Sequence, residues 1–120
     1  MSSLVQNIAF DCADPYALAT FWSKVLGAPL SPDDFAGDPE ASISQPGQPT
    51  LFFCKVPEQK VVKNRVHVCL RPDDQEAEVD RLLGLGATLV DDRRGLDDGG
   101  WVVLADPEAN EFCVLRGGKS

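Results

Sequence analysis

The chain has 120 residues, the size of one compact domain and enough to bury a hydrophobic core. Hydrophobic residues make up 43% of it and charged residues 25%, as in ordinary globular proteins, which excludes a disordered or collagen-like chain. Acidic side chains number 19 and basic ones 11, so the formal net charge is -8 and nucleic acid is excluded as a partner.

The sequence also bears on the location of the protein and on the chemistry of its cysteines. The sequence has no apolar run of the roughly 20 residues that a membrane span needs, and it begins without a signal-peptide pattern, so we expect a cytoplasmic protein with no membrane partner. The four cysteines lie in apolar runs without CxxC spacing, as buried reduced thiols do, which disfavours both structural zinc and disulfides. They are Cys12, Cys54, Cys69 and Cys113.

The first half of the chain begins with an apolar, β-prone run at residues 4–10 that predicts a strand. Asp14 and Pro15 follow as the N-cap and first residue of a helix. Apolar side chains from Leu18 to Leu26 recur at helical spacing, and Gly27 ends the helix. Turn-rich segments then separate three further short strands, predicted at residues 28–30, 41–44 and 50–56.

The second half repeats this order. We predict a strand at 65–70, a helix that Asp73 or Asp74 caps and that ends at 84–86, and strands at 87–90, 101–105 and 112–115. The sequence at 26–30 has a counterpart at 85–89. The chain therefore reads as one domain, residues 1–120, built from two βαβββ modules at about 4–56 and 64–116 with a linker at 57–63. Two such modules together bury faces that one module leaves open.

Specific segments add a family resemblance to this repeat. They are Asp14-Pro15, Phe21-Trp22, residues 63–67 and residues 104–113. With the two modules they resemble the vicinal oxygen chelate superfamily, and more narrowly its glyoxalase-like, bleomycin-resistance-like branch, over residues 4–116. The resemblance implies an α+β fold in which the modules form a curved mixed-sheet cavity with a divalent metal on its floor.

The resemblance also implies where the metal ligands of such a cavity would lie. The family takes them from the first and last strands of each module. In this sequence those positions carry Asn7, Phe53 (Phe52 if the register slips by one), His67 and Cys113. The spacing from Asn7 to His67 equals the spacing from Phe53 to Cys113, as a repeat requires. Only His67 is a ligand type that the family uses.

The loss of the other three family ligand types decides whether a metal cofactor is expected. A catalytic metal of this kind needs three or four imidazole and carboxylate ligands with a position open to substrate. A phenyl ring has no donor atom, and Asn7 offers only a neutral amide oxygen. We therefore expect no metal and no other cofactor. The remaining alternative is a zinc ion held by His67, Cys113 and a carbonyl group.

Five residues are candidates for ligand binding: Asn7, Phe53, His67, Trp101 and Cys113. His67 is either an interior histidine or a polar group on the cavity floor that anchors a ligand or acts as a general base. Cys113 is either a small core residue or a thiol that His67 activates in the same cavity. Phe52 and Phe53 are neighbours in a strand, so one faces the helix and the other the cavity, while Trp101 is expected at the cavity mouth.

Acidic side chains gather in two turn-rich segments, 33–40 and 91–98. They are either a solvated surface or a cavity rim that attracts a cationic ligand.

Three hypotheses follow. The first is a homodimer without metal that binds and sequesters a cationic or aromatic small molecule. The second is a lyase or isomerase with His67 as the catalytic acid or base, with or without a divalent metal. The third is a degenerate module that serves only assembly.

Overall fold

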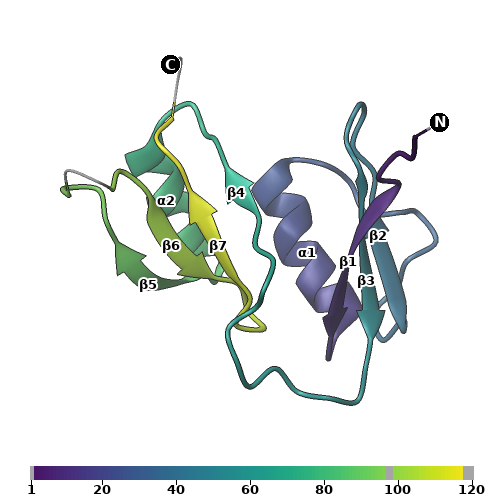
Figure 1. Cartoon of the computed structure of the whole chain (residues 1–120). Coiled ribbons are helices and arrows are strands. Elements are labelled where there is room, and N and C mark those ends of the chain that lie inside the picture. The colour runs from purple at the N-terminus through teal and green to yellow at the C-terminus, as the bar shows by residue number, and fades with distance from the viewer. Residues whose placement is uncertain (1, 97–98, 118–120) are drawn as a thin grey trace. The chain divides into compact units, whose positions relative to one another are not determined.

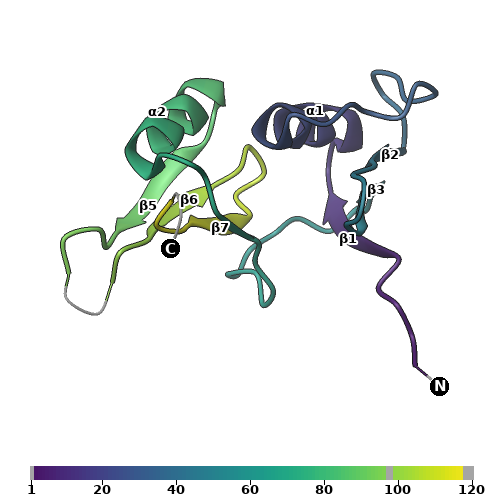
Figure 2. The ribbon, with the colours of Figure 1, turned by 90° about the horizontal axis from the view of Figure 1, so that it is seen from above.

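The computed structural model describes residues 2–96 and 99–117. The chain divides into two compact units, unit 1 (Met1–Lys60) and unit 2 (Val61–Ser120), and the division lies inside the predicted linker. Each unit holds one mixed sheet with one helix against one of its faces (Figures 1 and 2). Neither helix in the described residues has the length and apolar character of a membrane-spanning segment.

Unit 1 contains three strands in the order β1-β3-β2, with β1 and β3 parallel and β2 antiparallel to β3. Its elements are β1 (Asn7–Cys12), α1 (Pro15–Leu26), β2 (Glu40–Ile43) and β3 (Thr50–Lys55). The strand predicted at 28–30 is reduced to a single antiparallel bridge between Leu30 and Ile43. Unit 1 thus keeps only a remnant of its second strand.

Helix α1 forms as its capping residues predict. The backbone N–H of Ala17 donates to the Asp14 side chain (3.2 Å), and Gly27 ends the helix with φ of 65°. Leu18, Trp22 and Val25 form its buried stripe. The core of unit 1 is therefore aromatic and aliphatic, and it lies between α1 and one face of the sheet.

Unit 2 contains four strands in the order β4-β7-β6-β5, with β4 and β7 parallel and the other pairs antiparallel. Its elements are β4 (Cys69–Leu70), α2 (Gln75–Leu85), β5 (Thr88–Asp92), β6 (Val102–Ala105) and β7 (Glu111–Val114). Asp74 caps α2 by accepting from the backbone N–H of Ala77 (3.1 Å). Val79 and Leu82 of α2 are buried, as are Val102, Leu104 and Val114 of the sheet.

The strand predicted at 65–70 is wrong in length, because β4 has only two residues. Where the longer strand would have paired with β7, the side chain of Asn64 makes hydrogen bonds to the backbone of Glu111. Asn64 donates from Nδ2 to the carbonyl of Glu111 (3.0 Å) and accepts from the backbone N–H of Glu111 at Oδ1 (2.8 Å). The same Nδ2 also donates to the carbonyl of Val66 (2.8 Å), which bends the chain before β4.

A tight turn at residues 106–110 connects β6 to β7. The buried Asp106 carboxylate accepts from the backbone N–H groups of Glu108 and Asn110, both at 2.9 Å, and from Asn110 Nδ2 at 3.1 Å. Ala109 holds the left-handed position with φ of 70°, which disfavours a side chain with a Cβ atom. This turn sets the register in which β7 meets β6.

The registers of the two units correct the predicted repeat. Cys69 pairs with Cys113, whereas Ala9, the counterpart of Cys69 in the repeat, pairs with Phe52. Along the sequence, the last strands of the two modules are therefore one residue further apart than their first strands. Phe52, not Phe53, is the counterpart of Cys113. One irregularity that lengthens unit 2 is a bulge between Leu89 and Asp91, where β5 pairs with β6.

Candidate functional site

The sheet of unit 2 has one face against α2 and one open face. Along β7, Phe112 (1% exposed) and Val114 point to the α2 side, so Glu111, Cys113 and Leu115 point to the open face. Cys113 pairs with Cys69 on one side and with Val103 on the other. These pairings put Cys69, Cys113 and Val103 in one row across the open face.

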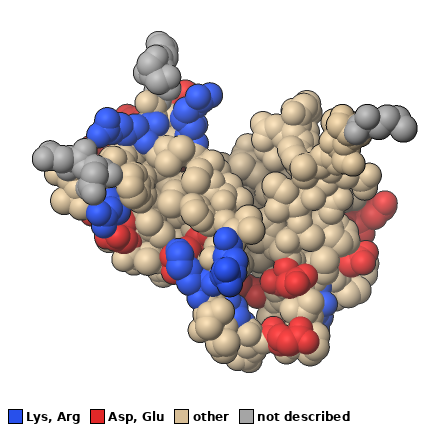
Figure 3. Space-filling model, in the orientation of Figure 1, with Lys and Arg blue, Asp and Glu red and all other residues tan. Residues whose placement is uncertain are grey.

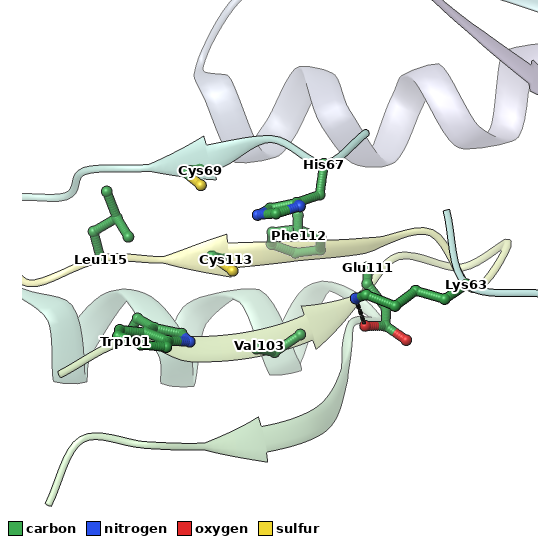
Figure 4. A pocket seen from close by; sticks show the side chains of 9 residues that line it. All are labelled: Lys63, His67, Cys69, Trp101, Val103, Glu111, Phe112, Cys113 and Leu115. Carbon is green, nitrogen blue, oxygen red and sulfur yellow. Dashed lines mark hydrogen bonds and ion pairs between the residues drawn. The ribbon is translucent and has the colours of Figure 1, made fainter. Parts of the chain in front are cut away.

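A pocket of about 390 Å³ lies on this open face, and we call it the open-face pocket (Figure 4). Such a volume lies within the range of small-molecule sites. Trp101, Val103 and Leu115 give it apolar walls, and His67, Cys69 and Cys113 add an imidazole and two thiols. Lys63 and Glu111 form an ion pair at one end. The pocket is thus mostly apolar with a few polar groups gathered together.

The polar groups in the pocket form what we call the His-Cys-Cys cluster. A ring nitrogen of His67 and the Sγ atoms of Cys69 and Cys113 all lie within 4.8 Å of one another. His67 and Cys69 are two positions apart on the same side of one extended segment, and Cys113 faces them from β7 (Figure 4). His67 is exposed on the open face of unit 2.

Cys113 is the least exposed member of the cluster, at 9%. Its burial, together with the neighbouring Cys69, raises the pKa of the Cys113 thiol, and the positive charge of Lys63 opposes this more weakly. A raised pKa keeps the thiol protonated near neutral pH. This is the opposite of what an activated nucleophile needs.

The charges near the pocket are largely paired. Asp91 pairs with Arg93 (3.3 Å) and Asp92 with Arg94 (2.7 Å), and the hydrogen bonds from Arg94 lower the pKa of Asp92 to about 2. Residues 97–98 of the predicted acidic segment lie outside the described residues. Figure 3 shows charged side chains along the margin of unit 2 and uncharged atoms over the middle of the face drawn.

The acidic segment of unit 1 has a structural role at two positions. Asp34 accepts from the backbone N–H of Ser42 (2.9 Å), and Asp38 accepts from the backbone N–H of Glu40 (3.0 Å). Both carboxylates therefore shape the loop before β2.

Unit 1 places its two candidate residues on different sides of its sheet. Asn7 lines a second pocket of about 370 Å³ with Gln6, Ser42, Thr50 and Phe52. Phe53 is 0% exposed and packs in the core, with its ring centroid 5.0 Å from that of Phe10. The predicted position of Phe53 on the ligand side needs correction, because β3 alternates and turns Phe52 to that side.

The structure thus brings together three of the five candidates, His67, Trp101 and Cys113, in one pocket of unit 2. It also adds Cys69, which the sequence predicts to be a buried thiol and which is exposed instead. The spacing of His67 and Cys69 is the signal that could have found it, since residues i and i+2 of a strand share a face. Arg93 contacts the indole of Trp101, with its guanidinium carbon 5.6 Å from the ring centroid.

Two α+β modules with mixed sheets, each with its helix on one face, define the fold of the glyoxalase, bleomycin-resistance and dioxygenase proteins. The model of the glyoxalase-like domain family matches residues 7–115, and the chain belongs to that family. Both the predicted family and the predicted fold class are confirmed. Comparison with curated proteins found no match.

Solved structures with this fold cover nearly the whole chain at low identity. A glyoxalase/bleomycin resistance protein/dioxygenase family enzyme from Burkholderia phytofirmans is 19% identical, with a TM-score of 0.74 over 95% of this chain and 98% of its own. The antibiotic binding protein TnmS3 from a Streptomyces species is 20% identical, with a TM-score of 0.68 over 96% of both chains. The fosfomycin resistance protein FosX from Mesorhizobium loti is 15% identical, with a TM-score of 0.72 over 100% of this chain and 94% of its own.

The divalent metal that the family resemblance implies does not fit the residues at its positions. In unit 1 the register assigns them to Asn7 and Phe52, an amide and a phenyl ring. In unit 2 they are His67 and Cys113, and the Cys113 position carries a thiol where the family has a carboxylate. Hard divalent metals prefer carboxylate and water oxygens, and this set supplies no carboxylate. We therefore assign no reaction step to such a metal.

Proposed function

We propose that the chain binds a small, uncharged aromatic molecule in the open-face pocket of unit 2. The observation that supports this most directly is the lining of the pocket, in which Trp101, Val103 and Leu115 form apolar walls around a few clustered polar groups. Apolar walls with few polar groups are typical of small-molecule sites. An indole wall also favours a flat aromatic ligand, since stacked and edge-on rings attract each other beyond the area they bury.

The pairing of charges favours a neutral ligand over the cationic one that the sequence also allowed. Glu111, the carboxylate that lines the pocket, pairs with Lys63. Asp91 and Asp92 pair with Arg93 and Arg94. A cationic ligand would have to compete with these basic side chains for the same carboxylates. TnmS3, an antibiotic binding protein, gives the proposal a precedent in this fold.

Calorimetric titration with 2-naphthol, which is neutral at pH 7, tests this proposal on the reduced, metal-free protein. We expect saturable binding that Trp101→Leu weakens at least about tenfold, because stacking and buried area are both lost. Phe35→Leu, at an exposed ring of unit 1, is the matched control and should leave the affinity unchanged. Absence of binding, or equal loss in both variants, would contradict the proposal.

A second proposal, that the chain is a lyase or isomerase, is supported by the imidazole of His67 in the same pocket. His67 would then give or take a proton on the bound molecule. If the chain converts a molecule that it binds, His67→Asn should abolish this conversion, while binding of the molecule, measured by calorimetry, persists. Turnover that survives this substitution would exclude His67 as the catalytic acid or base.

A further inference from the structure

The His-Cys-Cys cluster has the donor atoms of a metal site that differs from the one in the family. From these atoms we propose that His67, Cys69 and Cys113 bind one zinc ion on the open face of unit 2. Cys69 belongs to none of the four positions that the family resemblance implies. The proposal concerns unit 2 alone and does not depend on the aromatic ligand proposed above.

The distances suit this ion. Zinc binds thiolate sulfur at about 2.3 Å and imidazole nitrogen at about 2.0 to 2.1 Å. Tetrahedral ligands at those lengths lie about 3.5 to 3.8 Å from one another. The three atoms of the cluster already lie within 4.8 Å of one another, so a shift of about 1 Å completes the geometry. Rotation of the exposed His67 and Cys69 side chains can supply this shift, with no movement of the β4–β7 ladder.

The backbone places two of the three donors before any metal arrives. Cys69 and Cys113 are direct partners in the parallel ladder, and Cys113 N–H donates to the carbonyl of Val68 (2.9 Å). Asn64 anchors the segment that carries His67 through its two hydrogen bonds to Glu111. The donors are thus held by neighbouring strands, and little chain ordering accompanies binding.

Charge and softness favour zinc over hard divalent ions. Thiolates prefer zinc and other soft ions, whereas magnesium, calcium and manganese prefer oxygen. Two thiolates and a neutral imidazole carry a charge of about −2, which balances a divalent ion. A neutral complex suits walls made by Trp101, Val103 and Leu115, because burying net charge against apolar groups is costly.

The site would keep one coordination position open. Three protein ligands with a fourth, exchangeable position are the arrangement of catalytic zinc, whereas four protein ligands are typical of structural zinc. Glu111 also lines the pocket, but its carboxylate pairs with Lys63. A fourth position would then be left for water or for an oxygen or sulfur atom of a small molecule.

The test uses the full chain, reduced and stripped of metal, in competition with a chromophoric zinc chelator. We expect one zinc ion per chain. Loss of a residue that merely orients a ligand costs about 10- to 100-fold in affinity, so Cys69→Ala and His67→Ala should each cost at least about 100-fold. Cys54→Ala, which removes a thiol of unit 1, is the matched control and should leave the affinity unchanged.

The absorption spectrum of the protein with bound Co²⁺ is a second measurement, and it responds to residues that bind the metal directly. Co²⁺ bound at the cluster should show thiolate-to-metal charge-transfer absorption, which weakens in Cys69→Ala and in Cys113→Ala. Since Cys69 and His67 are exposed, their variants should fold even if that of the buried Cys113 does not. Zinc that fails to bind, or that binds the Cys69→Ala and His67→Ala variants as tightly as the unaltered chain, overturns the proposal.

Binding of zinc and binding of the aromatic molecule depend on different residues. The 2-naphthol titration is made on metal-free protein and depends on Trp101. Zinc binding depends on His67 and Cys69. A chain that binds the aromatic but no zinc contradicts only the metal site.

Discussion

Equivalent positions on the sheets of the two units carry different chemistry. Unit 1 has Asn7, Ala9 and Phe52 where unit 2 has His67, Cys69 and Cys113. The pairing of Ala9 with Phe52 matches that of Cys69 with Cys113, each between the first and last strands of a module. His67 differs from Asn7, because it precedes the two-residue β4 whereas Asn7 lies within β1.

The largest expected effect comes from building the His-Cys-Cys cluster into unit 1. In the variant with Asn7→His, Ala9→Cys and Phe52→Cys, we expect the zinc stoichiometry to rise from one to two per chain, because the pairing of Ala9 with Phe52 matches that of Cys69 with Cys113. Competition with the chelator measures this. The variant with only Asn7→His and Ala9→Cys is the control and should still bind one ion.

A second prediction tests which side of β3 faces the core. Phe53→Ala should lower the free energy of unfolding by about 3 to 5 kcal/mol, because it removes a fully buried ring that packs against Phe10. Phe52→Ala should cost only about 1 kcal/mol. Urea unfolding followed by the fluorescence of Trp22, in the core of unit 1, measures both. Equal losses would contradict the register of β3.

A third, smaller effect concerns the turn of unit 2 that sets the position of Cys113. Ala109→Gly should raise the stability by about 1 kcal/mol, since a left-handed conformation costs a residue with a Cβ atom about that much. The midpoint of thermal unfolding should then rise by about 3 to 6 °C. Ala105→Gly, in the strand before the turn, should instead lower it. A lower midpoint for Ala109→Gly would show that the turn is not strained.

The smallest expected effect concerns the charges near the pocket. Arg94→Ala should raise the pKa of Asp92 from about 2 toward its ordinary value of 3.8, because the hydrogen bonds from Arg94 hold it down. A lowered pKa stabilises the folded state above the ordinary pKa, and that contribution is lost as the pH falls from about 4 to about 2. Carboxyl NMR titration measures it. Arg81→Ala, whose partner is Glu78, should leave Asp92 unchanged.

Local signals in the sequence predict the helices and much of the pocket. Asp14, Asp74 and Gly27 mark helix ends by capping rules that need no tertiary context. The repeat points to His67 and Cys113, because duplicated strands are expected to bring equivalent positions to the same sheet face. Trp101 follows from its place at the start of a predicted strand.

Tertiary detail cannot be predicted in the same way. The pairing of Asn64 with Glu111 joins segments far apart in the chain, and β4 begins only five residues after Asn64, at Cys69. The last strands of the two units are offset by one position more than the first strands, and no local signal marks this difference. A slip of one position exchanges the two faces of a strand, which is why the sequence alone assigns Phe53 to the side where Phe52 lies.

The most direct test of the account uses the two indole N–H signals in the nitrogen-15 NMR spectrum, because Trp101 lines the open-face pocket and Trp22 lies in the core of unit 1. With 2-naphthol added to the metal-free protein, we predict that the Trp101 signal moves and saturates while the Trp22 signal stays in place. A Trp101 signal that stays unmoved at saturating 2-naphthol would contradict the claim that unit 2 holds the binding site.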